Sequence, residues 1–342
     1  TAVVGYGKVA HTHAQALSSL PESEFVAVYG RSLERAQAFA EQYGVRAYSE
    51  LAEMVEKDGV EAVVVCTPHP THAAPVIAAA KKPMRSNDAE PQASSLHDCD
   101  AMIGATRQRG VKLGAISQRR LYESVQRVKA AIEAGKIGQP ILGVVLLFGW
   151  RDEAYYASDP WRGTWDGEGG GLLVNQAPHQ LDLLHWLRWL RHSFSGFWDN
   201  LNHPYIEVED TAVAVVRFSS GALGSIILSN SQRPGMYGKV HVHGASGASV
   251  GVQTDGGAMF IAGMTSILEP PVNDLWTVPG EEGLLSQWQD EDRALFERID
   301  ATKYYHRLQV QDFLQAILED REPAINGEEG RKTVELFTAI YR

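Results

Sequence analysis

The chain has 342 residues, of which 44% are apolar and 21% are charged. These values are ordinary for a folded protein, and the length allows two domains of about 150 residues each. The 31 Lys and Arg residues against 42 Asp and Glu residues give a formal net charge of −11, which argues against general binding to nucleic acid or to a membrane. Two cysteines are too few for a disulfide framework. Because no long apolar run and no signal-peptide pattern occurs, we expect a cytoplasmic protein.

The first third of the chain alternates apolar runs, which predict strands, with segments whose apolar residues have helical spacing. In chain order these segments are 1–5, 9–20, 25–29, 36–43, 60–66 and 73–80. Strand, helix and strand in such short steps are typical of a parallel sheet with right-handed crossovers. We therefore predict a doubly wound, nucleotide-binding type of domain over residues 1–120.

The pattern changes after residue 120. Helices are predicted at 123–134, 304–318 and 328–341, and strands at 141–150, 211–218, 222–228, 239–243 and 248–253. Consecutive short strands with Gly and Ser turns favour an antiparallel or mixed sheet. We predict that residues 121–342 form a second domain of the α+β class.

The first strand leads into a glycine-rich turn, Gly5-Tyr6-Gly7-Lys8-Val9-Ala10. In such a turn Gly5 permits the tight bend, Gly7 leaves room for a pyrophosphate, and Ala10 lets the helix pack on the strand. Val9 and the neighbouring helix N-terminus supply backbone N–H groups to the phosphates. The plainer alternative is a glycine turn that packs and binds nothing. Its place in a βαβ unit favours a dinucleotide cofactor.

The end of the second predicted strand indicates which dinucleotide is preferred. An acidic residue usually stands there and accepts the ribose hydroxyls of NAD, but this chain has Gly30 followed by Arg31 and Ser32. Arg31 and Ser32 are suited to a 2′-phosphate, so the sequence favours NADP. The alternative is that Arg31 is a solvated charge and that NAD binds without the carboxylate.

The loop after the third apolar run contains Thr67, Pro68, His69 and His72. Loops at the carboxyl ends of parallel strands face the ligand, so we expect these residues to contact the cofactor. The two histidines suggest a metal pair, but the sequence offers no third ligand. We therefore predict cofactor contact and loop packing, with no metal.

The second domain contains three glycines, 169–171, followed by Asn175 and His179. These two residues are four apart, so on a continuous helix they would share one face. A single histidine in such a place is often structural. Three features favour a catalytic role for His179: the glycines that precede it, the polar Asn175 one turn away, and the nucleotide-type domain earlier in the chain.

The segments GYGKVAHTHAQAL, TPHPTH, EAGKIG and GGGLLVNQAPHQLD occur in this order along the chain. Together they resemble the Gfo/Idh/MocA oxidoreductases, the glucose-fructose oxidoreductase and inositol dehydrogenase superfamily. The resemblance implies an N-terminal Rossmann domain and a C-terminal α+β domain with an open, mostly antiparallel sheet. It also implies NAD(P)-dependent oxidation of a secondary hydroxyl on a sugar, cyclitol or related polyol. The sheet often forms the subunit interface, which implies a homodimer or homotetramer.

The resemblance also implies roles for particular residues. His179 matches the catalytic histidine, which takes the hydroxyl proton as hydride leaves, and general base help of this kind is worth roughly 10²–10⁴-fold. Asn175 matches a substrate-binding position that is commonly aspartate. The remaining matches lie near the nicotinamide, the cofactor or the substrate pocket: Thr67, Pro68, His72, Gln118, Arg119, Arg120, Trp161 and Arg162.

One motif departs from the family. A Glu-Lys-Pro sequence usually supplies a lysine that donates to the reacting hydroxyl, but alignment on Pro91 places Ala89 and Glu90 at those two positions. A carboxylate there opposes charge developing on the substrate oxygen. Residues 81–90 fall where a buried strand is expected, yet their composition fits no strand.

Three explanations compete for this departure. The protein is a weakened catalyst, or Glu90 has another role, or residues 81–90 are misread, as residues 188–193 also suggest by their unusual composition. The leading hypothesis is an NAD(P)-dependent sugar or cyclitol dehydrogenase. The alternatives are a non-catalytic cofactor-binding relative and an NAD-dependent glycosidase.

Overall fold

The computed structural model describes residues 1–81, 86–89, 93–187, 191–254 and 270–342. These residues divide into two compact units. The first unit comprises Thr1–Gln118 and Thr302–Val334, and the second comprises Arg119–Ala301 and Glu335–Arg342. The first segment of the first unit ends at Gln118, close to the domain boundary that the sequence predicted at residue 120.

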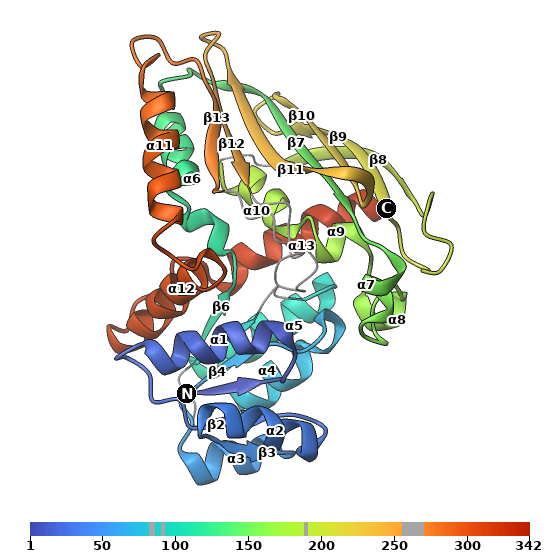
Figure 1. Cartoon of the computed structure of the whole chain (residues 1–342), viewed down its shortest axis with the longest axis vertical. Coiled ribbons are helices and arrows are strands. Elements are labelled where there is room, and N and C mark those ends of the chain that lie inside the picture. The colour runs from blue at the N-terminus through green and yellow to red at the C-terminus, as the bar shows by residue number, and fades with distance from the viewer. Residues whose placement is uncertain (82–85, 90–92, 188–190, 255–269) are drawn as a thin grey trace. The chain divides into compact units, whose positions relative to one another are not determined.

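The first unit contains a six-stranded parallel sheet (Figure 1). Its strand order is β3-β2-β1-β4-β5-β6, the order of a dinucleotide-binding Rossmann domain, which confirms the predicted fold class. The strands are β1 (Ala2–Val4), β2 (Ala27–Tyr29), β3 (Arg46–Tyr48), β4 (Ala62–Val65), β5 (Ser86–Ala89) and β6 (Lys112–Ala115). β1 and β4 are buried along their whole length, which explains their uninterrupted apolar sequences.

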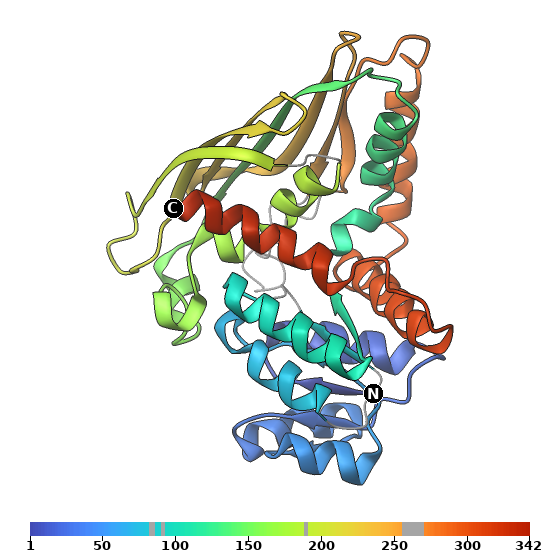
Figure 2. The ribbon, with the colours of Figure 1, turned by 180° about the vertical axis from the view of Figure 1, so that it is seen from behind.

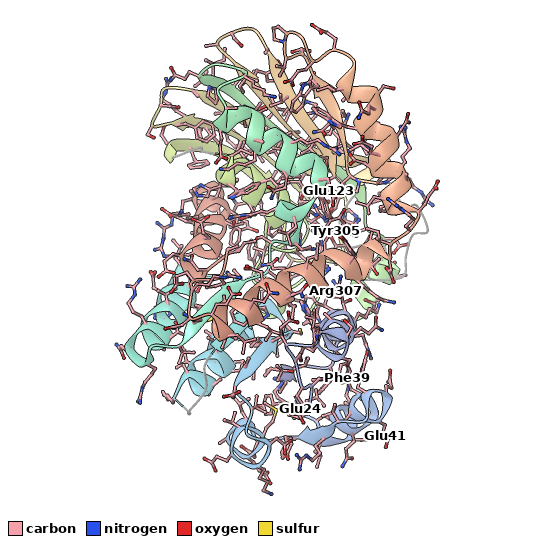
Figure 3. All side chains as sticks on the ribbon, turned by 90° about the vertical axis from the view of Figure 1, so that its left-hand side faces the viewer. Glu24, Phe39, Glu41, Glu123, Tyr305 and Arg307 are labelled. Carbon is pink, nitrogen blue, oxygen red and sulfur yellow. The ribbon has the colours of Figure 1, made fainter. Side chains whose placement is uncertain are left out.

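Helices cover this sheet, and their boundaries follow local sequence signals. The helices are α1 (Lys8–Ser19), α2 (Leu33–Tyr43), α3 (Leu51–Asp58), α4 (Ala73–Ala80), α5 (Leu96–Arg109) and α12 (Ala301–Leu318). Ser32 caps α2 by accepting a hydrogen bond from the N–H of Arg35, and Gly44 ends the helix at φ 67°; both are residue types that favour these positions. α2 turns Phe39 toward the core and Glu41 toward solvent (Figure 3).

Residues 302–334 belong to the first unit, which corrects their assignment to the second domain. The reason lies in the apolar side of α12, where Val310 and Leu314 are buried in the same core as Val3 and Ala14. Gln309 adds polar contacts, donating to the backbone oxygen of Ala115 at 2.6 Å and accepting from another backbone N–H of the unit at 2.9 Å. The helix is amphipathic, but its sequence does not identify the sheet against which it packs.

β5 lies between β4 and β6 and pairs with both in parallel. Its sequence, Ser86-Asn87-Asp88-Ala89, has no strand pattern, so the prediction that this stretch fits no strand was wrong for these four residues. Pairing along both edges outweighs the weak local preference. Glu90 and Pro91 lie outside the described residues.

The second unit is built on a seven-stranded mixed sheet of order β13-β12-β11-β7-β10-β9-β8. The β10–β7 pair is parallel and the other pairs are antiparallel, which confirms the predicted α+β class. The strands are β7 (Pro140–Trp150), β8 (Arg191–Asp199), β9 (Thr211–Phe218), β10 (Leu223–Ser229), β11 (Ser231–Gly244), β12 (Ser249–Thr254) and β13 (Val272–Trp276).

The helices of the second unit are α6 (Glu123–Glu133), α7 (Glu153–Ala157), α8 (Trp165–Glu168), α9 (Leu172–Asn175), α10 (Pro178–Trp186), α11 (Leu284–Phe296) and the end of α13 (Gly327–Tyr341). Of these, α6, α9, α10 and α11 pack against strands of this sheet (Figures 1 and 2). The opposite face of the sheet exposes apolar side chains, among them Phe197, Val213, Val215 and Leu223. Phe197 lies opposite Val213 across neighbouring strands. In the part of the chain that the structure describes, no helix combines the length and apolar character needed to cross a membrane.

The place of α12 gives a test with a matched control on the same helix. Leu314→Ala is expected to destabilise the protein by about 2–5 kcal/mol, because it opens a cavity in the core of the first unit. Leu318→Ala, at a position that is 64% exposed, is expected to change the stability by less than about 0.5 kcal/mol. Urea unfolding measures both values. In the Leu314→Ala variant we expect faster amide hydrogen exchange in α1, because residues of α1 share the core with Leu314. Unchanged exchange in α1 would contradict this packing.

Candidate active site

The glycine turn of the first unit has the geometry that a bound pyrophosphate needs. Gly5 has φ 111°, and a Cβ there would lie 2.7 Å from the backbone oxygen of Cys66, so only glycine fits. Gly7 is the N-cap of α1 and makes no side-chain cap hydrogen bond, and a Cβ at Gly7 would have no atom within 4 Å. The first turn of α1, which includes Val9, therefore follows a residue with open space beside it, and its backbone N–H groups can receive a phosphate. Ala10, one residue further, is buried.

The loop after β4 lies against this turn and is held by one histidine. His72 is buried, and its Nε2 lies 2.5 Å from the backbone oxygen of Thr67. Its ring also packs edge-on against His69 at 5.7 Å between ring centroids. In the described part of the chain no group of three His, Cys, Asp or Glu side chains is arranged to hold a metal ion.

Two buried polar atoms in the first unit fit a bound cofactor. Thr67 Oγ1 and Gln118 Oε1 have no hydrogen-bond partner among the described residues. A buried polar atom without a partner is costly and calls for a specific explanation. Both residues were predicted from the sequence to contact the cofactor, and a bound cofactor would supply their partners.

The end of β2 is shaped by the ring of Tyr6, the residue between the two glycines of the turn. A Cβ at Gly30 would lie 2.0 Å from Cε1 of this ring, so a side chain at that position would require the ring of Tyr6 to move. The Tyr6 hydroxyl accepts a hydrogen bond from the N–H of Ser32 at 3.4 Å, and the guanidinium of Arg35 lies 4.8 Å from the ring centroid. Arg31 is exposed.

In the second unit, Asn175 and His179 do not lie on one continuous helix. α9 ends at Asn175 and α10 begins at Pro178, so the premise of a single helix was wrong. Within residues 171–180, however, these are the two residues that are partly exposed, and the other eight are buried. Of the polar side chains in this stretch, these two are therefore accessible to a ligand.

Glu209 holds the glycine segment that leads into α9. Its carboxylate accepts hydrogen bonds from the N–H groups of Gly171 and Leu173, both at 2.9 Å, and from the hydroxyl of Tyr341 at 2.8 Å. Burial raises the pKa of Glu209, and these donors oppose that shift. A Cβ at Gly171 would lie 2.1 Å from the backbone oxygen of Glu209, so this close approach requires the glycine.

A second buried carboxylate, Glu168, contacts Asn175 directly. Its Oε2 accepts from the N–H of Gly163 at 2.6 Å, and its Oε1 accepts from Nδ2 of Asn175. Burial raises the pKa of Glu168 to about 7. The hydroxyl oxygen of Tyr155 accepts a hydrogen bond from Nη1 of Arg162 at 2.6 Å, and it also lies 3.4 Å from Nδ2 of Asn175.

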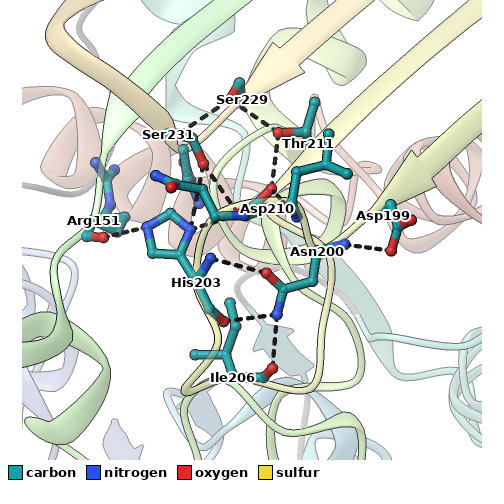
Figure 4. A network of polar contacts seen from close by, with 12 residues as sticks. Arg151, Asp199, Asn200, His203, Ile206, Asp210, Thr211, Ser229 and Ser231 are labelled. Carbon is teal, nitrogen blue, oxygen red and sulfur yellow. Dashed lines mark hydrogen bonds and ion pairs between the residues drawn. The ribbon is translucent and has the colours of Figure 1, made fainter.

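A polar network beside β9 fixes the segment that carries Glu209 (Figure 4). His203 is buried, with Nδ1 2.6 Å from Oδ2 of Asp210 and Nε2 2.7 Å from the backbone oxygen of Arg151. Both ring nitrogens of His203 thus face oxygen atoms of the protein. Burial alone would raise the pKa of Asp210, but hydrogen bonds from His203, Thr211 and backbone N–H groups together outweigh burial and lower it. The network thus holds the residue next to Glu209 in one position.

Three predicted residues of the second unit are engaged within the protein. Arg120 is buried and forms a two-point pair with Asp182 of α10, from Nε at 2.8 Å and from Nη2 at 2.6 Å. We therefore retain for Arg120 only a role in positioning α10. Arg162 lies 4.4 Å from the ring centroid of Trp161 and 4.4 Å from that of Tyr155. Arg119 is buried beside Arg120 in the 3-10 turn η2 (Gln118–Leu121).

Sequence reasoning missed Glu168, Glu209 and Tyr341. Glu168 directly precedes the three glycines, and this adjacency was the one available signal. Glu209 and Tyr341 are 38 and 170 residues from Gly171, and no spacing rule connects such distant positions.

The chain matches two family models. Residues 1–116 match an oxidoreductase family with an NAD-binding Rossmann fold, and residues 125–250 match the GFO/IDH/MocA C-terminal domain. Among curated relatives, it is 27% identical to myo-inositol 2-dehydrogenase of Thermotoga maritima over 99% of this chain and 94% of the relative. It is 28% identical to the NAD(+)-dependent scyllo-inositol 2-dehydrogenase of Bacillus subtilis over 72% of each chain.

Solved structures with the same fold include relatives with bound ligands. The WlbA dehydrogenase of Bordetella pertussis, in complex with NADH and UDP-GlcNAcA, is 28% identical with a TM-score of 0.87 over 100% of this chain and 94% of that chain. The WlbA dehydrogenase of Chromobacterium violaceum, with the same two ligands, is 26% identical with a TM-score of 0.85 over 99% and 92% of the two chains.

Removal of one donor to Glu209 tests the support of the glycine segment. Tyr341→Phe is expected to lower the free energy of unfolding by about 1–3 kcal/mol, because a buried carboxylate loses a hydrogen bond. The hydroxyl of Tyr341 stabilises the charged form of Glu209, so the loss is expected to shrink as the pH falls and this carboxylate becomes protonated. Urea unfolding at pH 8 and pH 5 measures it. Tyr205→Phe, at a position 40% exposed, is the control, and an equal small effect of both would refute the role.

Proposed function

Because the chain belongs to the Gfo/Idh/MocA family of NAD(P)-dependent oxidoreductases, we propose that it oxidises a secondary hydroxyl of a cyclitol, a sugar or a related polyol, or reduces the corresponding ketone. One observation supports this most directly. Asn175 and His179 are the two partly exposed residues in an otherwise buried segment, and buried carboxylates hold that segment in place.

The chemistry assigns a task to each of these side chains. When bound, the nicotinamide cofactor supplies the hydride acceptor or donor. His179 takes the proton of the substrate hydroxyl, a task for which an imidazole that titrates near neutral pH is suited. Asn175 hydrogen-bonds a substrate hydroxyl. Arg119, Trp161 and the matched position Glu90 remain proposed contacts of the reacting groups.

We propose that the first unit holds the cofactor through backbone and small polar groups. The turn from Gly5 to Ala10 receives the pyrophosphate on the backbone N–H groups that begin α1. Thr67 and Gln118 offer their buried oxygens, and Pro68, His69, His72 and Pro91 complete the proposed cofactor loops.

We further propose that NADP is preferred to NAD. Glycine stands at residue 30, and the ring of Tyr6 occupies the space beside it, so this chain lacks there the carboxylate that accepts the ribose hydroxyls of NAD. Arg31 and Ser32 follow at the end of β2, and Arg31 is exposed and so available to a 2′-phosphate.

The names of the relatives guide the choice of substrate class. Two curated relatives are inositol dehydrogenases, and two structural relatives were solved with UDP-GlcNAcA. A cyclitol and the sugar of a nucleotide sugar share ring hydroxyls as the reacting groups. We propose this class, with the secondary hydroxyl as its common feature.

The exposed apolar face of the second sheet supports a homodimer or homotetramer. Phe197 is 84% exposed, and Val215 and Leu223 are 58% and 49% exposed. Such side chains on one face of adjacent strands mark an interaction surface. A second copy of this chain is the proposed occupant.

The catalytic assignment predicts the result of replacing His179. Absorbance of the reduced nicotinamide is followed over a panel of myo-inositol, scyllo-inositol, UDP-sugars and the corresponding ketones. His179→Ala is expected to lower kcat by about 10²–10⁴-fold with little change in cofactor affinity. His97→Ala, at a side chain that is 90% exposed, is the control. Absence of turnover by the wild type with both cofactors would refute the proposed activity.

The cofactor preference predicts a selective effect at Arg31. Arg31→Ala is expected to weaken NADPH binding by about tenfold, because one charge-assisted contact to the phosphate is lost, and to leave NADH binding within about threefold. Fluorescence titration of the reduced cofactors measures both dissociation constants. Arg109→Ala, at another exposed arginine of the first unit, is the control. Tighter binding of NADH than of NADPH by the wild type would overturn the preference.

The proposed subunit interface predicts a change of mass in solution. Val215→Lys places a charge in the centre of the apolar face and is expected to shift an oligomer toward the monomer. Light scattering coupled to gel filtration measures the mass. Leu201→Lys, at a loop residue that is 69% exposed, is expected to leave it unchanged. A monomeric wild type would contradict the proposal.

A further inference from the structure

We infer that Glu168 is a positioning residue: its buried carboxylate turns the amide of Asn175 so that the carbonyl oxygen Oδ1, and not the NH2 group, is presented to a substrate. This inference rests on the proposed function, because it concerns the group that Asn175 offers to a substrate hydroxyl. An amide has a donor at one end and an acceptor at the other, so its orientation decides which substrate group it can bind.

The contacts of Glu168 determine which end of the amide faces inward. Glu168 is 1% exposed, and both of its carboxylate oxygens accept hydrogen bonds. Oε2 accepts from the N–H of Gly163 at 2.6 Å, and Oε1 accepts from Nδ2 of Asn175. An ionised carboxylate has no hydrogen to donate. The opposite orientation would place two acceptor oxygens against each other at a buried position, so the NH2 end must face Glu168.

A second contact holds the same end of the amide. Nδ2 of Asn175 lies 3.4 Å from the hydroxyl oxygen of Tyr155. The same oxygen accepts a hydrogen bond from Nη1 of Arg162 at 2.6 Å. Tyr155 is 1% exposed, so this contact also lies on the protein side of Asn175. The carbonyl oxygen is left for the partly exposed side of the residue.

The charges around Glu168 set the pH range over which the orientation is fixed. Burial raises the pKa of Glu168 to about 7, Arg162 opposes this shift, and Glu209 adds to it. The hydroxyl groups of Tyr156 and Tyr341 are the other titratable groups that interact with it. Above pH 7 the carboxylate is ionised and accepts only. Below this pH it gains a hydrogen, which it can donate to the carbonyl end of the amide.

The pair therefore predicts a set of coupled substitutions. In Glu168→Gln the introduced amide accepts from Gly163 and donates to Oδ1 of Asn175, so the amide of Asn175 reverses while the contacts of residue 168 with Gly163 and Asn175 are kept; the longer contact from Nδ2 of Asn175 to the Tyr155 hydroxyl is lost. Adding Asn175→Asp restores an outward acceptor, because one carboxylate oxygen accepts from the introduced amide and the other faces the substrate. Asn175→Asp alone places two carboxylates in contact, which is unfavourable.

Amide NMR tests the orientation without any substrate. In protein labelled with 15N-asparagine, the NH2 signal of Asn175 is identified by its loss in Asn175→Asp. This signal is expected to titrate with a midpoint of about pH 7 in the wild type and to lose that titration in Glu168→Gln. The amide of Asn200, which donates to the backbone oxygens of His203 and Ile206 at 2.8 Å each, is the internal control and is expected to stay constant.

Kinetics test the consequence for the substrate, using whichever polyol of the panel the wild type turns over. Glu168→Gln is expected to lower kcat/KM by about 10- to 100-fold while its Tm stays within about 3 °C of the wild type. The double variant Glu168→Gln/Asn175→Asp is expected to recover kcat/KM to within about threefold. Asn175→Asp alone is expected to have a Tm lower by roughly 5 °C or more at pH 8.

Two results would overturn the inference. One is an Asn175 signal that is constant with pH in the wild type, or that titrates equally in Glu168→Gln. The other is a loss of activity in Glu168→Gln that the double variant does not recover, since that pattern indicates a purely structural role. If the wild type turns over no member of the panel, the proposed function fails, and the amide titration still decides the orientation of Asn175.

Discussion

The burial of two carboxylates, Glu168 and Glu209, is the constraint on which the site of the second unit depends. Taking a carboxylate out of water is costly, and burial raises the pKa of both groups accordingly. Backbone N–H groups that face them offset that cost by donating hydrogen bonds. α9 has four residues and would not be stable as an isolated helix. These hydrogen bonds give Asn175 a fixed position.

Other features of the second unit follow from this arrangement. Gly171 is required because the backbone of Glu209 approaches it too closely for any Cβ. The buried His203–Asp210 pair fixes the chain one residue beyond Glu209. Glu209 is therefore held by the segment before β9 as well as by its hydrogen bonds to the residues around the start of α9. The contacts of Glu168 and of Glu209 thus meet on one short segment, and the apolar face of the sheet is exposed.

In the first unit, the candidate cofactor site is shaped mainly by the space that side chains fill or leave open. The ring of Tyr6 fills the position where a side chain at residue 30 would stand, and the uncapped start of α1 leaves backbone N–H groups for a phosphate. A strand as polar as Ser86–Ala89 is accommodated because β4 and β6 pair with both of its edges. Local preference yields to pairing when the neighbours on each side are already strands.

The sequence by itself determined the Rossmann-type unit and the mixed sheet after it, and it singled out candidate site residues near the glycine segment. These features depend on local periodicity and on motifs whose members lie within a few residues, as for Gly5 and Gly7 or for Asn175 and His179. Only the tertiary structure decided that α12 joins the first unit and that Glu168 and Glu209 support Asn175. The physical reason is that burial brings distant residues into contact, and no local pattern in the chain records such a meeting.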